Sequence, residues 1–123
     1  MSLSDYIKTA DFKAEKHVPV IEAPESVADG SIANIIVSVG KEIAHPNTIE
    51  HFIGWIELYY RSDDGKFVQR IGKVEFSAHG ESDLYAEPYA AFVAKIPASG
   101  TLTALSYCNL HGLWESERKI TVK

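Results

Sequence analysis

Regularly placed turn residues divide the chain into short runs of β-branched and aromatic residues. The run 32–39 ends at Gly40, and the run 53–61 is followed by Asp64-Gly65, a dipeptide typical of tight hairpin turns. Helical character is limited to one short turn at 4–8, for which Ser4 is the expected cap. Because sheets built from such strands bury their apolar faces by packing on one another, the pattern favours an antiparallel β-sandwich.

The pattern predicts an all-β fold, an immunoglobulin-like antiparallel seven-stranded sandwich or barrel, as a single domain over residues 1–123. Pro19 is expected at a sheet edge or at the start of a strand, and Gly72 is expected to bend its strand. Asp64-Gly65 is expected to supply positive φ angles to its turn. The strands are expected at 15–22, 32–39, 53–61, 67–77, 89–96, 101–107 and 117–122, and the longer loops at 41–51, 78–88 and 108–115.

Charge and cysteine usage narrow the function classes. The 123 residues carry a net charge of −5, so nucleic acid and anionic membranes are poor partners. The single cysteine excludes an internal disulfide and fits a reducing compartment. We find no apolar run of signal-peptide or membrane-spanning length and expect a cytoplasmic protein.

A cysteine and a histidine three positions apart, Cys108 and His111, offer two metal ligands on one loop. His45 and His51 bracket another expected loop, and His17 lies at the start of an extended segment. Loops cluster at the ends of a sandwich, so these side chains can converge there. The alternative interpretation is a buried cysteine with incidental histidines, because free cysteine is among the most buried residue types.

The number of candidate ligands constrains the metal. Structural zinc takes four ligands and catalytic zinc usually takes three with a water, so four imidazoles and a thiolate are one ligand too many. A blue-copper site adds a weak axial methionine, and the only methionine here is Met1. Four nitrogens in a plane with sulfur on the axis suit iron and leave a sixth position open. A cupredoxin-like copper electron-transfer protein remains the main alternative, and metal analysis would discriminate between the two.

The chain contains three separated motifs, Glu15-Lys16-His17-Val18-Pro19, His45-Pro46-Asn47-Thr48-Ile49-Glu50-His51 and Tyr107-Cys108-Asn109-Leu110-His111-Gly112-Leu113-Trp114-Glu115. They resemble those of the superoxide reductases, the family also called neelaredoxin or the centre-II domain of desulfoferrodoxin. The resemblance extends from about Asp11 to Val122 and implies an immunoglobulin-like β fold. The chain lacks the additional four-cysteine iron domain of desulfoferrodoxin and so resembles the one-iron class. It departs from many relatives at Phe52, where a second histidine often follows the ligand.

The resemblance implies an oxidoreductase that reduces superoxide to hydrogen peroxide at one mononuclear non-haem iron per chain. Glu15 would occupy the sixth position in the ferric state and leave it on reduction, and Lys16 would lie beside the open site. The electron donor would be a rubredoxin or a similar small redox protein, and the assembly a homotetramer or a homodimer. The implied metal ligands are His17, His45, His51 and His111 in the equatorial plane and Cys108 on the axis.

Other prominent side chains are interpreted as structural. The fifth histidine, His79, is expected to be structural and to lie at a subunit contact. Trp55, Tyr59, Tyr60 and Trp114 are expected in the core or an interface, and Trp114 can also shield the metal pocket. No carboxylate pair or nucleophile–base motif indicates a hydrolase.

Overall fold

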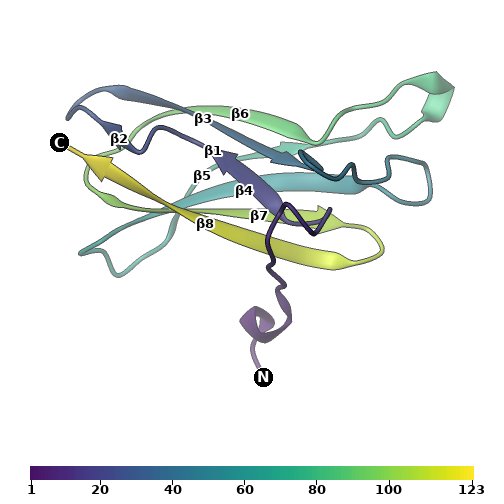
Figure 1. Cartoon of the computed structure of the whole chain (residues 1–123), viewed down its shortest axis with the longest axis horizontal. Coiled ribbons are helices and arrows are strands. Elements are labelled where there is room, and N and C mark those ends of the chain that lie inside the picture. Colours follow the sequence, from purple (N-terminus) through teal and green to yellow (C-terminus); the bar gives the residue numbers. More distant parts are fainter.

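Two sheets, antiparallel apart from one short parallel pairing, pack face to face in the computed structural model, which describes all residues 1–123 (Figure 1). The smaller sheet has the strand order β1-β3-β6, and the larger has the order β2-β8-β7-β4-β5. This arrangement confirms the predicted all-β, immunoglobulin-like sandwich. The strands are β1 (Pro19–Glu22), β2 (Ser26–Val27), β3 (Ile32–Val39), β4 (Ile53–Ser62), β5 (Gln69–Glu75), β6 (Tyr89–Lys95), β7 (Gly100–Cys108) and β8 (Gly112–Val122).

Alternation of inward-facing and outward-facing side chains along the strands creates the core between the sheets. On β7 the side chains of Leu102, Ala104, Ser106 and Cys108 are all fully buried and share one face. Successive strand residues point to opposite faces, so this row faces the smaller sheet while Tyr107 faces outward. Ile35 and Val37 of β3 face the larger sheet in the same way and are fully buried. Burial of these apolar side chains is the main stabilising contribution, and it makes the end of β7 a rigid support.

The strand count is eight rather than the predicted seven. The additional strand, β2, has only two residues and pairs parallel with β8, a signal too short to recognise in sequence. β8 begins at Gly112 rather than at 117, because the β7–β8 connection is a tight turn and Cys108 already pairs with Gly112. The prediction of a loop over 108–115 is therefore wrong, and Trp114 lies on a strand.

Two local predictions were wrong in detail. The helical turn is a 3-10 helix, η1 (Leu3–Tyr6), with Ser2 rather than Ser4 at its cap. Gly65 does not adopt positive φ. The position is crowded instead: an added Cβ would lie 2.5 Å from Oγ of Ser62, so a larger residue would displace that side chain.

The bend expected at Gly72 is a β-bulge. The register between β4 and β5 shifts where Leu58 pairs with Gly72 and Tyr59 pairs with Arg70, so Ile71 is the extra residue. Above this bulge, an added Cβ on Gly72 would lie 3.0 Å from the ring of Phe92 in the opposite sheet. The glycine therefore lets the two sheets approach each other.

Side-chain hydrogen bonds join the two sheets along the edge formed by β1 and β8. Ser116 and Arg118 of β8 donate to the carbonyl oxygens of Pro19 and Ile21, at 2.6 and 3.2 Å. These bonds fix the start of β1, and with it the residues immediately before, against the larger sheet. The loop before β4, the β7–β8 turn and the β5–β6 connection gather at one end of the sandwich, on the right in Figure 1. No helix is long and apolar enough to span a membrane.

Candidate metal centre

Cys108 ends the buried row of β7 and lies at the base of the site. Its side chain is fully buried, and its sulfur is 3.7 Å from Nδ1 of His111. A turn of three residues connects it to Gly112, whose φ of 79° is the left-handed conformation that closes such hairpins. The turn therefore carries His111 back over the cysteine sulfur.

His17, immediately before β1, is held from several sides. Its carbonyl oxygen accepts a hydrogen bond of 3.1 Å from the buried hydroxyl of Ser106. Its ring stacks on Trp114, with ring centroids 5.0 Å apart, and the indole N–H of Trp114 donates to the carbonyl of His111. Trp114 thus contacts the ring of one candidate ligand and the backbone of another, which is consistent with the expected shielding of the pocket.

His45 and His51 are presented by the loop between β3 and β4. Gly40 begins this loop with a φ of 88°, and an added Cβ there would lie 2.8 Å from the backbone nitrogen of His45. Nδ1 of His45 is 2.6 Å from the carbonyl oxygen of Pro46, which fixes this nitrogen as the donor and leaves Nε2 as the free atom. Thr48 accepts from the backbone N–H of His51, which closes the loop on itself.

Asn109 joins the two ligand-bearing loops. Its Oδ1 accepts from the backbone N–H of Phe52 at 2.9 Å, and its Nδ2 donates to the carbonyl oxygen of Glu50 at 2.8 Å. Its own backbone N–H donates to the carbonyl of Phe52. One asparagine between Cys108 and His111 therefore fixes the segment on either side of His51.

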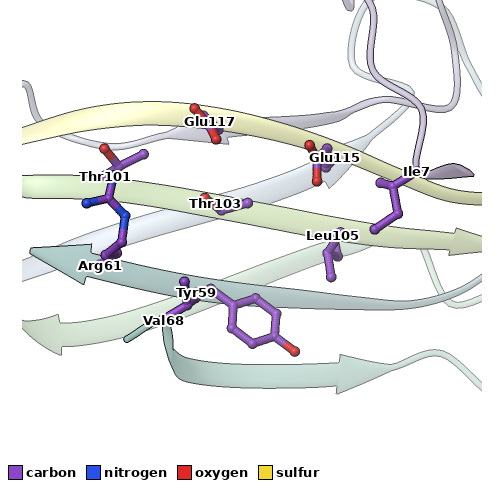
Figure 2. Close-up of a pocket in the computed structure, with 9 residues that line it drawn as sticks. All are labelled: Ile7, Tyr59, Arg61, Val68, Thr101, Thr103, Leu105, Glu115 and Glu117. Carbon is purple, nitrogen blue, oxygen red and sulfur yellow. The ribbon is translucent and has the colours of Figure 1, made fainter. Parts of the chain in front are cut away.

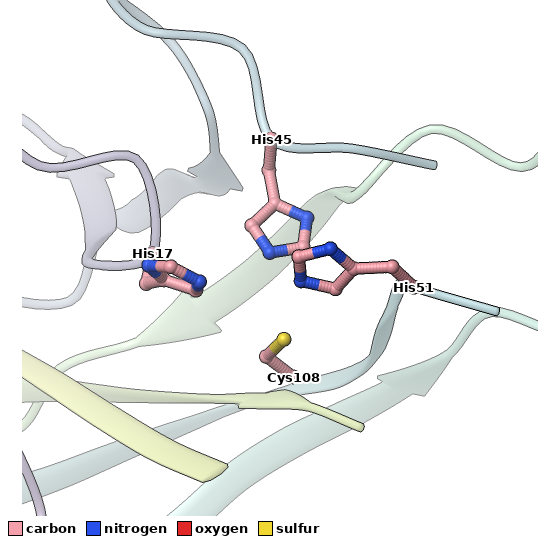
Figure 3. Close-up of side chains that lie close together, drawn as sticks. All are labelled: His17, His45, His51 and Cys108. Carbon is pink, nitrogen blue, oxygen red and sulfur yellow. The ribbon is translucent and has the colours of Figure 1, made fainter. Parts of the chain in front are cut away.

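Four imidazole rings form a square. Neighbouring rings are 4.7–5.0 Å apart between centroids and are inclined at 64–76°, whereas His17 and His51 face each other across the square at 6.3 Å. Figure 3 shows three of these rings with the cysteine sulfur to one side of them. The ligand atoms of His17, His45, His51 and Cys108 all lie within 4.8 Å of one another. His111 lies beside this group, with its Nδ1 3.1 Å from Nε2 of His17.

The chemistry of this donor set fits a metal ion. Nε2 of His45 and Nε2 of His51 are buried without a hydrogen-bond partner, which is costly unless another group binds them. Burial lowers the pKa of His45 to about 4, and burial together with the charges of His111 and His17 also lowers the pKa of His51. Both rings are therefore neutral near neutral pH and keep a lone pair for a metal.

Glu15 and Lys16 differ in how they relate to the square. Oε1 of Glu15 is 2.6 Å from Nδ1 of His17 and also accepts from the His17 backbone N–H at 2.8 Å. Burial raises the pKa of Glu15, but the hydrogen bonds from His17 outweigh it and hold the pKa below its usual value. Glu15 here contacts the nitrogen of His17 that is not turned toward His111, so it orients the ring. Lys16 is half-buried and directly precedes His17, and its positive charge contributes to the lowered pKa of both His45 and His51.

The residues that sequence reasoning missed are the hydrogen-bonding supports, Asn109 and Ser106. Asn109 stands inside a recognised motif, and the only signal for it was a turn-forming amide between two ligands. Ser106 is a small polar residue in an apolar row, a signal that its hydroxyl needs a buried partner. A separate groove of about 320 Å³ lies on the outer face of the larger sheet, between residues such as Tyr59, Leu105 and Glu115 (Figure 2). Its lining shares no residue with the metal centre.

The fold and the site define a class: β-sandwich proteins with a mononuclear metal site built from histidines and one cysteine. Residues 9–117 match the family model described as desulfoferrodoxin. The chain is similar to a superoxide reductase from Pyrococcus furiosus, with 52% identity over 94% of this chain and 96% of that protein. It is also similar to a neelaredoxin from Megalodesulfovibrio gigas, with 45% identity over 100% of both.

Among solved structures, the crystal structure of a Thermotoga maritima protein superposes on this chain with a TM-score of 0.97 at 54% identity. The superposition covers 100% of this chain and 98% of that chain. A family match of this extent, with relatives matched over nearly their full length, shows the family. The chain belongs to the desulfoferrodoxin and superoxide reductase family, as the three motifs predicted.

Proposed function

We propose that this chain is a superoxide reductase, which converts superoxide to hydrogen peroxide with one electron and two protons. The observation that carries the proposal is the square of four imidazoles with one buried thiol to its side. The two relatives named above as superoxide reductase and neelaredoxin support it, because they match nearly the whole chain.

The proposed cofactor is one mononuclear non-haem iron per chain. His17, His45, His51 and His111 would hold it from the sides, and Cys108 would bind it from below. Iron in this position would supply the single electron and a free coordination position for a small anion. The two unpartnered ring nitrogens support this assignment, because metal binding would satisfy them.

Cys108 would hold the ion from the core side of the square. The fully buried sulfur is held by a core strand on the inner side of the square, so the opposite side is the one left for substrate. A rigid sulfur donor also raises the electron density available to the ion it binds. The protein therefore separates an inner, dry side that holds the ion from an outer side that meets solvent.

Lys16 would attract and orient the anionic substrate. The protein has a net charge of −5, so long-range attraction of an anion is absent and a local cation is needed. Lys16 makes no salt bridge, unlike several other lysines, and its charge acts on His45 and His51. Its ammonium group could also hold the water that delivers protons to the product.

Glu15 would have two positions in this proposal. In one it accepts the Nδ1–H of His17, as it does here, and in the other its carboxylate binds the ferric ion at the sixth position. A hard carboxylate oxygen suits the ferric more than the ferrous state. We further propose a rubredoxin or a similar small redox protein as electron donor, a homotetramer or homodimer as the assembly, and the cytoplasm as the location.

The test combines metal analysis with stopped-flow reaction of the reduced protein with superoxide. We expect one iron per chain, rapid superoxide consumption and an equivalent yield of hydrogen peroxide. A Cys108→Ser variant should lose the sulfur-to-iron charge-transfer band of the oxidised protein. Copper at one per chain, or an iron-loaded protein that does not react with superoxide, would reject the proposal, and the first of these outcomes would support a cupredoxin-like protein instead.

A further inference from the structure

His79 lies outside the metal square and has no part in the function proposed above. Its side chain is buried, with 5% of the residue exposed, in the connection between β5 and β6. Its ring stacks flat on that of Phe52, with centroids 3.9 Å apart and planes inclined at 12°. His79 therefore packs under the same loop that presents two candidate metal ligands.

Both ring nitrogens of His79 face oxygen atoms. Nε2 is 2.7 Å from the carbonyl oxygen of Phe76, and Nδ1 is 3.1 Å from Oδ1 of Asn47. The amide of Asn47 has one orientation, because its Nδ2 donates to the carbonyl oxygen of Ala86 at 3.0 Å. Its oxygen is thereby directed at His79.

These contacts determine the protonation of the ring. A carbonyl oxygen and an amide oxygen only accept hydrogen bonds, so each nitrogen of His79 must donate. A neutral imidazole has one donor and one acceptor nitrogen, so it would satisfy one contact and oppose two lone pairs in the other. Only the doubly protonated ring makes both bonds.

A carboxylate contacts the backbone of His79 rather than its ring. Both carboxylate oxygens of Glu81 lie within hydrogen-bond distance of the His79 backbone N–H, at 3.0 and 3.3 Å. The other titratable side chains of this connection are Asp83, Glu87 and Tyr85, and Tyr85 forms a β-bridge with His79. Asn47 and Phe52, from the loop packed against it, carry no charge. The polar contacts of the ring itself are therefore its two hydrogen bonds, to Phe76 and Asn47.

We propose that His79 is an imidazolium that holds the loop 45–51 in place and so positions the metal ligands His45 and His51. Asn47 lies between these two histidines in sequence, and His79 fastens it to the β5–β6 connection. His79 is thus a positioning residue that contacts no ligand itself. The inference rests on the proposed function only in requiring that this loop binds a metal ion.

The protonation state is measured directly on the wild-type chain. In ¹⁵N-labelled, metal-free protein at pH 7, long-range ¹H–¹⁵N correlation should show both ring nitrogens of His79 with protonated shifts. His45 should show a neutral ring under the same conditions. The His79→Gln variant assigns the signals by their loss. An unprotonated nitrogen on His79 overturns the proposal, whether or not any variant folds.

The positioning role is measured by metal release. Protein loaded with Co²⁺ is mixed with excess chelator, and the visible absorption is followed over time. His79→Gln and Asn47→Ala should each speed release about tenfold, the usual scale for groups that orient metal ligands. The double variant should release no faster than either single one, because both changes break one contact. The matched control is Asn34→Ala, at an exposed position on β3, which should not alter release.

Unchanged release in both single variants, or independent additive effects, would contradict the positioning role. These readouts do not use superoxide. A protein that shows the doubly protonated ring and coupled release, yet fails to consume superoxide, would reject only the proposed activity. An active enzyme with a neutral His79 would reject only the proposal that a His79 imidazolium holds the loop 45–51.

Discussion

Replacing Asn109 by alanine should destabilise the metal-free protein and weaken metal binding together. Alanine removes the acceptor of the Phe52 N–H at 2.9 Å and the donor to the Glu50 carbonyl at 2.8 Å. The first bond is partly buried, and an unpaired buried donor costs about 1–3 kcal/mol. The second is exposed, so water replaces the lost donor at little cost. We therefore expect the free energy of unfolding to fall by about 2 kcal/mol.

The same change should lower the affinity for Co²⁺ about tenfold, because the loops that carry His51 and His111 lose their common anchor. Asn109→Asp separates the two bonds, since it keeps the acceptor for Phe52 but loses the donor to Glu50. Asn109→Asp should therefore lower the free energy of unfolding by less than Asn109→Ala does. Denaturant unfolding gives the stability and calorimetric titration gives the affinity, with the exposed Asn34→Ala as control. If alanine altered stability but left the affinity unchanged, Asn109 would be a structural residue without a role at the site.

Three further outcomes are expected. Lys16→Ala should slow superoxide consumption several-fold and weaken its dependence on ionic strength; exposed Lys13→Ala is the control, and equal rates in stopped flow would remove the steering role. Glu15→Ala should leave turnover largely intact but change the absorption of the ferric protein, and an identical spectrum would exclude Glu15 as a ligand. Burial raises the pKa of Tyr60, so its contribution to stability is full below about pH 10 and declines as pH rises through the higher folded value. Unfolding of Tyr60→Phe should therefore depend less on alkaline pH than that of the parent, and parallel curves would refute this assignment.

Strand positions and candidate ligands were predictable because both leave direct patterns in the sequence. β-branched runs predicted β3 and β4 closely, since period-two burial needs such residues along the whole strand. Histidines between strands predicted a shared end, since loops of a sandwich meet there. The start of β8 was missed because polar residues and Gly112 gave the turn and the following strand the same appearance.

The supports of the site could not be predicted in the same way. Ser106 and Asn109 bind backbone carbonyl and N–H groups, and every residue of the chain offers those groups. The sequence therefore gives no information about which ones will be near. For His79, the sequence indicated a structural histidine, which the structure bears out, but not its partner. The subunit contact expected for it stays a prediction, and its burial within one chain provides no support for that contact.

The supports also explain how a site with two unpartnered ring nitrogens keeps its geometry. Two buried ring nitrogens lack partners, so the geometry of the square is costly and would relax if the loops were free to move. The core strand under Cys108, the indole under His17 and the amide of Asn109 each restrain a different side of the square. The cost of arranging the ligands is therefore met on folding rather than on metal binding, and this preorganisation leaves more of the binding energy for affinity.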